Sequence, residues 1–494
     1  MTKNEKKYLG RKEAFMKEKK LGLGSVIATG VGLVVASSCL LSIGIGTSAI
    51  GITFIISMVV ACILNIVTLL SIAELNALMP DLTGGLAQYS LACVGPFITI
   101  ICMVGGYALC NTIAGSVEGA MFGNTIASLL PGVSVPGWVY CVILVVLLMI
   151  ANLNGVDVFI KIQDFVAYAL IASLVIMGVM GALGIGTGEI VEQPAVIASD
   201  FSSITGLCGL AFFLFIGGEY VVPLTKEVKN AKRDIPLGMI LSMLIILAMQ
   251  IFLTLGFKNY TSWEELGAST TPHILFGRML LGSFGRYWMV IVSLLAVISS
   301  VNTVMSSLSY ILLGMAKIGL LPSVFNKTNK KNAPYVGIIF EAAAFCIINI
   351  TGLSTTDSLS FLISVLAILW MLSYVVSNLN VLLLRKRLPN APRNFKVPLG
   401  PVFPVVGIFG TIWMIYNIDP DLSVKLSLYK VCGVIILALT LYAFFWLKFQ
   451  VKRPFFKPYP VKEVMAMENE LYEKYHRPKK KKESGSEREQ SRAS

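Results

Sequence analysis

The chain has 494 residues, of which 56% are hydrophobic and only 14% are charged, and its formal net charge is +13. A soluble domain of this length would need more charged residues to cover its surface, so the composition excludes an ordinary soluble protein. Lysine and arginine are concentrated at the two ends and in short loops, which argues against a DNA-binding face and is typical of a membrane protein.

The first 20 residues are polar and basic, and an apolar block follows them directly. No charged residue occurs from Leu21 to Ala73, a stretch long enough for two bilayer crossings of roughly 20 residues each. We expect no cleavable signal peptide, because the apolar block follows a polar start and runs on too long.

Hydropathy predicts twelve membrane spans, near residues 22–46, 50–77, 96–128, 136–154, 157–184, 204–224, 236–256, 286–314, 336–353, 357–384, 400–418 and 427–449. With the N-terminus inside, only Lys258, Arg278, Arg286 and Lys425 are basic residues on the outer side, and Lys430 lies at a helix end. An even number of spans returns the C-terminus to the same side. We therefore expect a multi-pass plasma-membrane protein with both termini in the cytoplasm.

Two predicted spans contain short runs of small residues, where a helix would be weak. These runs are 35–39 in the first span and 216–218 in the sixth, five spans apart. Interrupted helices at matching places in two halves indicate a transporter binding site, because a break exposes backbone N–H and C=O groups that a zwitterion or a cation can satisfy. Glycine and serine also allow close helix packing, so both interpretations stay open at this point.

A motif in the sixth span carries a family resemblance. Residues 212–236 read FFLFIGGEYVVPLTKEVKNAKRDIP. This segment resembles the F-x-G-x-E…E-x-K-N-P-x-R-x-I-P signature of the amino acid–polyamine–organocation (APC) transporters, with Ala231 where the family usually has proline.

Three further segments agree with that family in the right order. Residues 73–85 resemble its A-E-L…P-x-x-G-G stretch, and residues 387–398 are similar to its R-P-F-K-V-P entry to span eleven. Residues 309–322 resemble its S-R-x-x-x-x-M-A-R-D-G-x-L-P ending of span eight, although Tyr310 replaces the usual arginine and Ile318 the acidic residue. The resemblance covers roughly residues 20–450.

The resemblance implies an all-α integral membrane fold with about twelve transmembrane helices. Helices one to ten would form a five-plus-five inverted repeat of the LeuT type, with helices one and six broken and two helices appended. The chain would then divide into a cytoplasmic N-terminal segment (1–20), the transport core (21–384), an inner loop with helices eleven and twelve (385–450), and a basic, partly disordered cytoplasmic tail (451–494).

The resemblance also implies where substrate binds. In relatives, the substrate's carboxylate meets backbone N–H groups of broken span one, and its ammonium meets carbonyls at the ends of the broken helices. Ser37 and Ser38 stand where the family has its G-S-G donors, and Phe213 stands at an aromatic gate position. The residues expected to bind substrate are Val34, Ser37, Ser38, Cys39, Asn111, Phe213, Leu214, Ile216, Gly217 and Gly218.

Charged residues at membrane depth cost at least ~2.5–3.5 kcal/mol on insertion scales, so each calls for an explanation. Glu219 follows the break in span six and is assigned either to coupling or gating or to a structural role. Glu118 in span three is assigned to neutralising a cation, relaying a proton, or lying in water near the outer mouth. These two are the only acidic residues placed well within the spans that line the expected site. Glu74 is expected in a cytoplasmic gate network, and Lys161 and Asp164 at the membrane interface.

Coupling is expected to depend on span five. Proton-coupled and some exchanging relatives have a lysine there, where this chain has Leu170. The lysine ammonium would occupy the space of a sodium ion, so its absence leaves room for sodium or for exchange without a coupling ion. A carboxylate that takes up a proton is the alternative. Expected oxygen donors in span eight are Ser299, Asn302, Thr303 and Ser306.

The expected function is secondary transport of a neutral amino acid, with sodium or a proton as coupling ion and no cofactor. The alternatives are a polyamine or organic-amine permease, an amino acid exchanger, and a membrane sensor that binds an amino acid without moving it. The chain has no P-loop, and its two histidines, His273 and His476, lie in polar segments, which argues against a membrane enzyme or an ATP-driven pump. Expected partners are the amino acid and membrane lipid, and neither nucleic acid nor an obligatory protein partner is expected.

Overall fold

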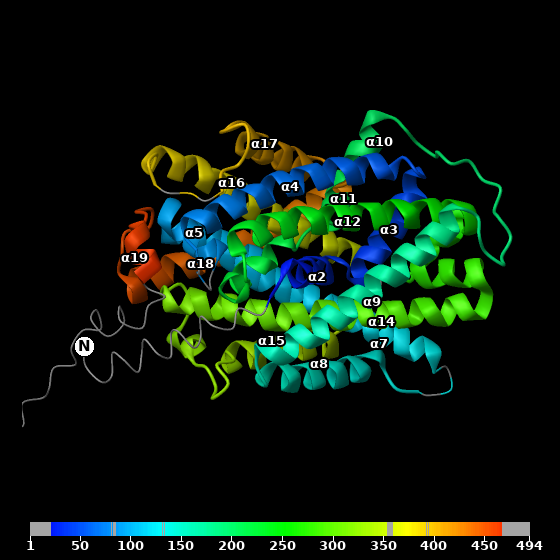
Figure 1. Cartoon of the computed structure of the whole chain (residues 1–494), viewed down its shortest axis with the longest axis horizontal. Coiled ribbons are helices and arrows are strands. Elements are labelled where there is room, and N and C mark those ends of the chain that lie inside the picture. Colours follow the sequence, from blue (N-terminus) through cyan, green and yellow to red (C-terminus); the bar gives the residue numbers. More distant parts are fainter. Residues whose placement is uncertain are drawn as a thin grey trace, which may run out of the picture.

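The computed structural model describes residues 21–80, 82, 85–130, 132, 134–352, 359–391, 393 and 395–466. This part of the chain is helical, with two isolated β-bridges and no strand. Most of the long helices run lengthwise through the molecule (Figure 1). The predicted segment 1–20, the tail after residue 466, and the motif residues Gly84, Pro392 and Asn394 lie outside the described residues.

The elements of the first half are α2 (Leu23–Val34), α3 (Ser37–Ile50), α4 (Phe54–Leu78), α5 (Leu86–Cys93), α6 (Pro96–Thr99), η1 (Ile100–Leu109), α7 (Cys110–Leu129), α8 (Gly137–Leu153), α9 (Val156–Ala182), α10 (Phe201–Gly206) and α11 (Cys208–Phe213). Those of the second half are η2 (Gly218–Glu227), α12 (Ala231–Tyr260), α13 (Trp263–Ala268), α14 (Pro272–Lys317), η3 (Ser323–Asn326), α15 (Tyr335–Ile350), α16 (Leu359–Arg387), α17 (Val402–Tyr416), α18 (Leu422–Trp446), η5 (Leu447–Val451) and α19 (Val461–Ala466).

Every one of the twelve predicted spans coincides with helical structure. Among the described residues, eight helices are long and apolar enough to cross a membrane, and α2 with α3 forms a further span that bends by 62° at its break. The remaining three predictions fall on the shorter apolar helices α8, α15 and α17. This confirms an all-α membrane protein, while the inverted repeat and the proposed domain boundaries stay predictions.

The two predicted helix breaks are present, and the backbone accounts for each. After α2, Val35 leaves the helical region and Ala36 is extended, with φ −102° and ψ 162°. After α11, the chain turns through residues 214–217 into the 3₁₀ helix η2, and Gly217 has φ +123°. Residues with a side chain rarely adopt that value of φ, so the second break depends on glycine.

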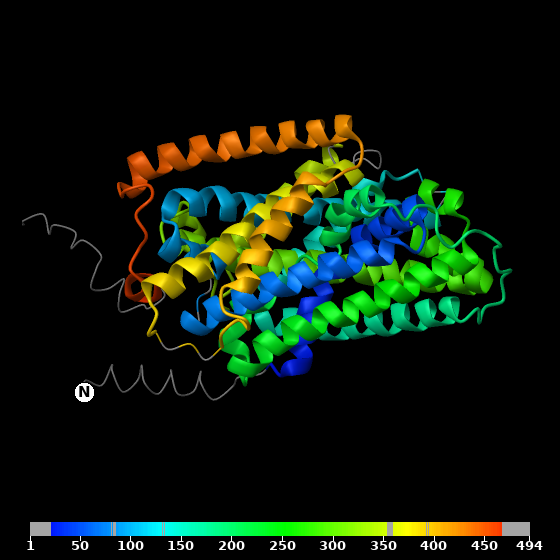
Figure 2. The ribbon, with the colours of Figure 1, turned by 90° about the horizontal axis from the view of Figure 1, so that it is seen from above.

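The breaks lie together in the interior. Helix α2 packs against η2, α3 packs against both α11 and α7, and α14 contacts α2, α3 and α7. In contrast, α18 lies along the edge of the molecule (orange in Figure 2), and most of its residues are exposed. The fold thus places both breaks in the buried core and leaves the last long helix at the periphery.

One residue lies in a different environment from the one predicted. His273, expected in a polar segment, is fully buried in the first turn of α14. Neither of its ring nitrogens has a hydrogen-bond partner among the described residues. Hydropathy gave the wrong environment for His273 because the segment around it is polar. In the structure, the first turn of α14 packs inside the protein and the imidazole ring is enclosed.

Candidate functional site

The first half of the site is the start of α3, where a carboxylate from another helix is bound. The backbone N–H of Ser37 donates to Oε2 of Glu118 at 3.0 Å, and the N–H of Ser38 donates to Oε1 at 2.9 Å. Glu118, on α7, is 2% exposed, so it is buried rather than lying in water at an outer mouth. The first N–H groups of a helix have no partner within the helix and carry partial positive charge, which suits a carboxylate.

The second half of the site is Glu219, directly after the break in span six. Its carboxylate accepts three hydrogen bonds: from the Tyr107 hydroxyl at 2.9 Å, the Trp370 indole N–H at 3.0 Å and the Tyr374 hydroxyl at 2.6 Å. All four residues are buried. The three donors satisfy a group that would otherwise be costly at this depth, and they connect the break to η1 and to α16.

Tyr107 lies in an irregular part of span three. Residues Ile100–Leu109 form the π-helix η1 before the regular helix α7 begins. A π-helix changes the direction in which side chains leave the helix and is frequent at functional sites. The Tyr107 ring is stacked against Tyr220 at 5.7 Å between centroids and lies 5.8 Å from Trp370. The carboxylate of Glu219 is therefore held beside a cluster of aromatic rings.

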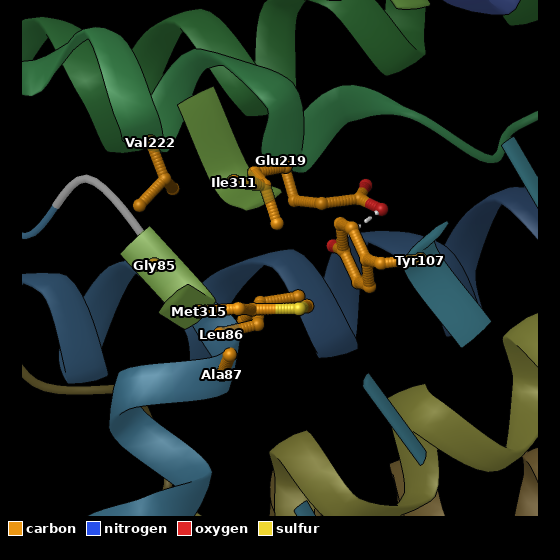
Figure 3. Close-up of a pocket in the computed structure, with 8 residues that line it drawn as sticks. All are labelled: Gly85, Leu86, Ala87, Tyr107, Glu219, Val222, Ile311 and Met315. Atoms are coloured by element: carbon orange, nitrogen blue, oxygen red, sulfur yellow. Dashed lines mark hydrogen bonds between the residues drawn. The ribbon is translucent and has the colours of Figure 1, made fainter. Parts of the chain in front are cut away.

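A pocket opens beside this cluster. It is lined by Gly85, Leu86, Ala87, Tyr107, Glu219, Val222, Ile311 and Met315 (Figure 3). Tyr107 and Glu219 contribute its polar side-chain groups, and the other lining side chains are apolar or absent. In this structure the free space inside the lining is about that of one water molecule, so a larger ligand would enter only if the lining side chains moved apart.

All ten residues predicted to bind substrate are buried. They lie on α2, α3, α7, α11, the turn after it and the start of η2; α2 contacts η2, and α3 contacts both α7 and α11. Several of their polar groups are already used: the Ser37 hydroxyl lies 3.1 Å from the Ser293 hydroxyl, the Asn111 amide donates to the Tyr107 carbonyl at 2.7 Å, and the Leu214 carbonyl accepts from Gln250 at 3.1 Å. The structure brings the set together, and its role in binding stays a prediction.

Comparison with known proteins decides the family. Residues 21–437 match the family model described as amino acid permease. The chain belongs to the amino acid permease family. It is 23% identical to the branched-chain amino acid permease BcaP of Bacillus subtilis over 84% of this chain and 90% of that protein. It is 27% identical to the serine/threonine exchanger SteT of the same organism over 70% of this chain and 78% of that protein.

The fold agrees with this assignment. The nucleobase-cation-symport-1 family transporter MHP1, in a closed conformation, superposes with a TM-score of 0.55. The alignment covers 91% of this chain and 97% of that one at 15% identity, so it shows a shared fold. This permease is a membrane transporter and not an enzyme.

Besides Glu118 and Glu219, the residues predicted for coupling lie on α14 and α9 of the permease. The Ser299 hydroxyl donates to the Gly32 backbone carbonyl of α2 at 2.8 Å, and the side-chain oxygen Oδ1 of Asn302 accepts from the side-chain amide of Asn152 at 2.9 Å. Thr303 and Ser306 are buried, and Leu170 of α9 is fully buried. The Thr303 hydroxyl, one helical turn after Ser299 on α14, is buried and has no hydrogen-bond partner among the described residues.

Sequence reasoning missed two residues that bind Glu219 and one further buried carboxylate, which does not contact either break. Trp370 and Tyr374, one helical turn apart on α16, bind Glu219, and their four-residue spacing in an apolar span was the available signal. Glu341 of α15 is a third fully buried carboxylate, whose oxygens accept from the Thr112 hydroxyl at 3.2 and 3.0 Å. It was overlooked because span nine was not expected to line the site. In the described part of the chain, no lysine or arginine pairs with any of these three carboxylates.

Two predicted inner-end residues of the permease form contacts between spans. Glu74 of α4 accepts from Arg385 at 2.9 and 2.5 Å and from the backbone N–H of Val397 at 2.8 Å, and it lies 3.4 Å from Arg393. The Ser25 hydroxyl donates to Asp164 at 2.8 Å, which ties α2 to α9. The side chain of Lys161 lies outside the described residues. A gating role for Glu74 stays a prediction.

Proposed function

We propose that this permease carries an amino acid with an apolar side chain, or a small amine of similar shape, across the plasma membrane by alternating access. The observation that carries the proposal is the pair of helix breaks packed together in the core, each beside a buried carboxylate. A break leaves backbone groups without helical partners at membrane depth, and transporters use such groups to bind polar cargo. In this proposal both termini lie in the cytoplasm.

The apolar lining supports a neutral side chain on the cargo. Val34, Phe213 and Ile216 surround the breaks, and the pocket beside Glu219 adds Leu86, Val222, Ile311 and Met315. Two relatives that share most of their length with this chain are named for branched-chain amino acids and for serine and threonine, which are neutral. A negatively charged side chain on the cargo would lie beside the buried carboxylates Glu118 and Glu219, which disfavours an acidic amino acid.

For coupling, we propose sodium or plain exchange. Leu170 provides no charge at the position where some relatives have a lysine, and α14 provides the Ser299 hydroxyl beside the end of α2 and the buried Thr303 hydroxyl one turn further along. Sodium binding needs several oxygen ligands and no titrating group, which this region can supply with the carbonyls of α2. Proton uptake by a buried carboxylate is the competing mechanism.

The test is counterflow in proteoliposomes that contain the purified permease. Vesicles are loaded with unlabelled leucine, valine, serine or the corresponding amines, and entry of a trace of labelled leucine is followed. Accumulation that depends on the internal compound, and is absent from protein-free vesicles, supports transport. Ligand-dependent thermal stabilisation of the detergent-solubilised protein without any counterflow would instead identify a sensor.

A further inference from the structure

The hydrogen bonds at the first break leave no backbone donor available for a cargo carboxylate. The N–H groups of Ser37 and Ser38 are bound by Glu118. The N–H of Ala36 donates to the Val34 carbonyl at 3.0 Å, and those of Cys39 and Leu40 donate to the Ala36 carbonyl at 3.1 and 3.2 Å. Every N–H from residue 36 to residue 40 therefore has a partner within the protein.

The carboxylate of Glu118 occupies the position that the carboxylate of a bound amino acid would take. Its two oxygens each accept one N–H in the first turn of α3, which is how a free carboxylate binds a helix start. The side chain is 2% exposed, and Ser37 and Ser38 are 0% and 3% exposed. The carboxylate is thus fully enclosed at the place where the family resemblance puts the carboxylate of the substrate.

An amino acid would have to displace this side chain. Its carboxylate would take the two N–H groups and leave Glu118 buried beside a second negative charge, with no lysine or arginine paired to it among the described residues. Like charges repel strongly in a medium of low dielectric constant, so the displacement is unfavourable. A primary ammonium has the opposite effect, because it neutralises the carboxylate.

Glu118 retains the capacity to bind an ammonium while it is held by α3. A carboxylate has about four acceptor sites on its two oxygens, and the backbone N–H groups of Ser37 and Ser38, with the Ser38 hydroxyl beside them, do not use them all. The remaining lone pairs can accept N–H groups of an ammonium ion. Backbone carbonyls at the end of α2 can add further acceptors.

We propose that Glu118 takes the place of the cargo's own carboxylate, so that the preferred cargo is a primary amine with an apolar body and no carboxyl group. Chemically, this is the amine that remains when a neutral amino acid loses its carboxyl group as carbon dioxide. The inference rests on the proposed transport function and makes Glu118 the residue that discriminates amines from amino acids.

The experiment compares matched pairs that differ only in the carboxyl group: leucine with 3-methylbutylamine, and phenylalanine with 2-phenylethylamine. Equilibrium binding to the purified full-length protein is measured for the wild type, Glu118→Gln, Glu118→Ala and the control Glu341→Gln. Glu341 is an equally buried carboxylate that contacts Thr112 and not the break, so its amide should leave the preference unchanged. Folding of each variant is verified by its elution as a single species and by its unfolding temperature.

The wild type is expected to bind each amine at least about tenfold more tightly than the matched amino acid. Glu118→Gln should weaken amine binding by roughly tenfold or more, because the counter-charge is lost. Glu118→Ala frees the two N–H groups and should reverse the preference in favour of the amino acid. A wild type that prefers the amino acids, or an unchanged preference in folded Glu118→Ala, overturns the proposal. The binding preference is measured without transport. A failure of counterflow would therefore contradict the proposed transport function without deciding whether Glu118 selects amines over amino acids.

Discussion

The indole N–H of Trp370 donates to Oε1 of Glu219 at 3.0 Å, across 151 residues of sequence. This bond joins the broken sixth span to α16, so the position of the break depends on a helix that does not contain it. Tyr107 and Tyr374 complete the set of donors to the same carboxylate. The arrangement predicts that loss of a single donor impairs transport.

We expect Trp370→Phe to lower the initial rate of uptake by roughly tenfold. The substitution keeps an aromatic ring and removes one hydrogen bond to a carboxylate, and such bonds contribute about 1.5–3 kcal/mol. The control is Trp263→Phe, since the Trp263 indole also donates one hydrogen bond, to the backbone oxygen of Pro194, but that bond is exposed. Equal rates for the two variants would remove the Glu219 cluster from the transport mechanism.

Gly217→Val is expected to abolish uptake. Gly217 has φ +123° and ψ −5°, a backbone conformation that valine adopts only with strain of order 1–3 kcal/mol. The control is Gly282→Val, since Gly282 also has a positive φ, of +61°, and lies in α14 with no atom within 4 Å of an added Cβ. Membrane expression and uptake are measured together. Full activity of expressed Gly217→Val would exclude the second break from the site.

Among amino acids, we expect leucine, isoleucine, valine and phenylalanine to compete for uptake better than arginine or lysine. Most side chains around the breaks are apolar, and the two buried carboxylates there, Glu118 and Glu219, already accept hydrogen bonds from the protein, so the lining favours an apolar side chain on the cargo. The measurement is inhibition of labelled uptake by a panel of unlabelled amino acids at one concentration. Displacement by arginine and lysine alone would contradict a neutral side-chain site.

Coupling is tested with imposed gradients in vesicles, each with the other ion clamped. We expect stimulation by an inward sodium gradient, or dependence on internal amino acid alone if the permease is an exchanger. In the sodium case, Ser299→Ala should weaken the dependence on sodium, because its hydroxyl lies beside the first break at 2.8 Å from the Gly32 carbonyl. Stimulation by a pH gradient only, lost in Glu219→Gln, would establish proton coupling instead.

Glu74→Ala is expected to lower the stability of the detergent-solubilised protein substantially. Removing one partner of a buried ion pair costs about 3–5 kcal/mol, because the remaining charge is uncompensated, and Arg393 beside Glu74 is 3% exposed. The control is Glu463→Ala, which breaks the more exposed pair of Arg453 with Glu463 and should cost at most about 1 kcal/mol. Unfolding temperatures of the two variants are compared. Similar values would show that Glu74 does not hold α4 against α16.

The spans, the breaks and the family could be predicted from the sequence. The cost of placing charge in hydrocarbon depends on each segment's own composition, so uncharged stretches such as Leu21–Ala73 identify membrane helices directly. The breaks were predictable for a similar local reason. Small residues weaken a helix where they stand, and Gly217 has the backbone conformation that requires glycine.

The partners of the buried carboxylates were decided only by the tertiary structure. In the sequence, Glu118 is an isolated acidic residue in an apolar span, and its donors at Ser37 and Ser38 are 81 and 80 residues away. Glu341 was passed over because its span was not expected near the site. Hydropathy reports the free energy of one segment in lipid, whereas a hydrogen-bond partner depends on the rotation and distance of one helix relative to another. The rotation and distance of the helices are set by packing across the whole core. The sequence could therefore show which spans contain a carboxylate, whereas only the tertiary structure shows which groups donate hydrogen bonds to it.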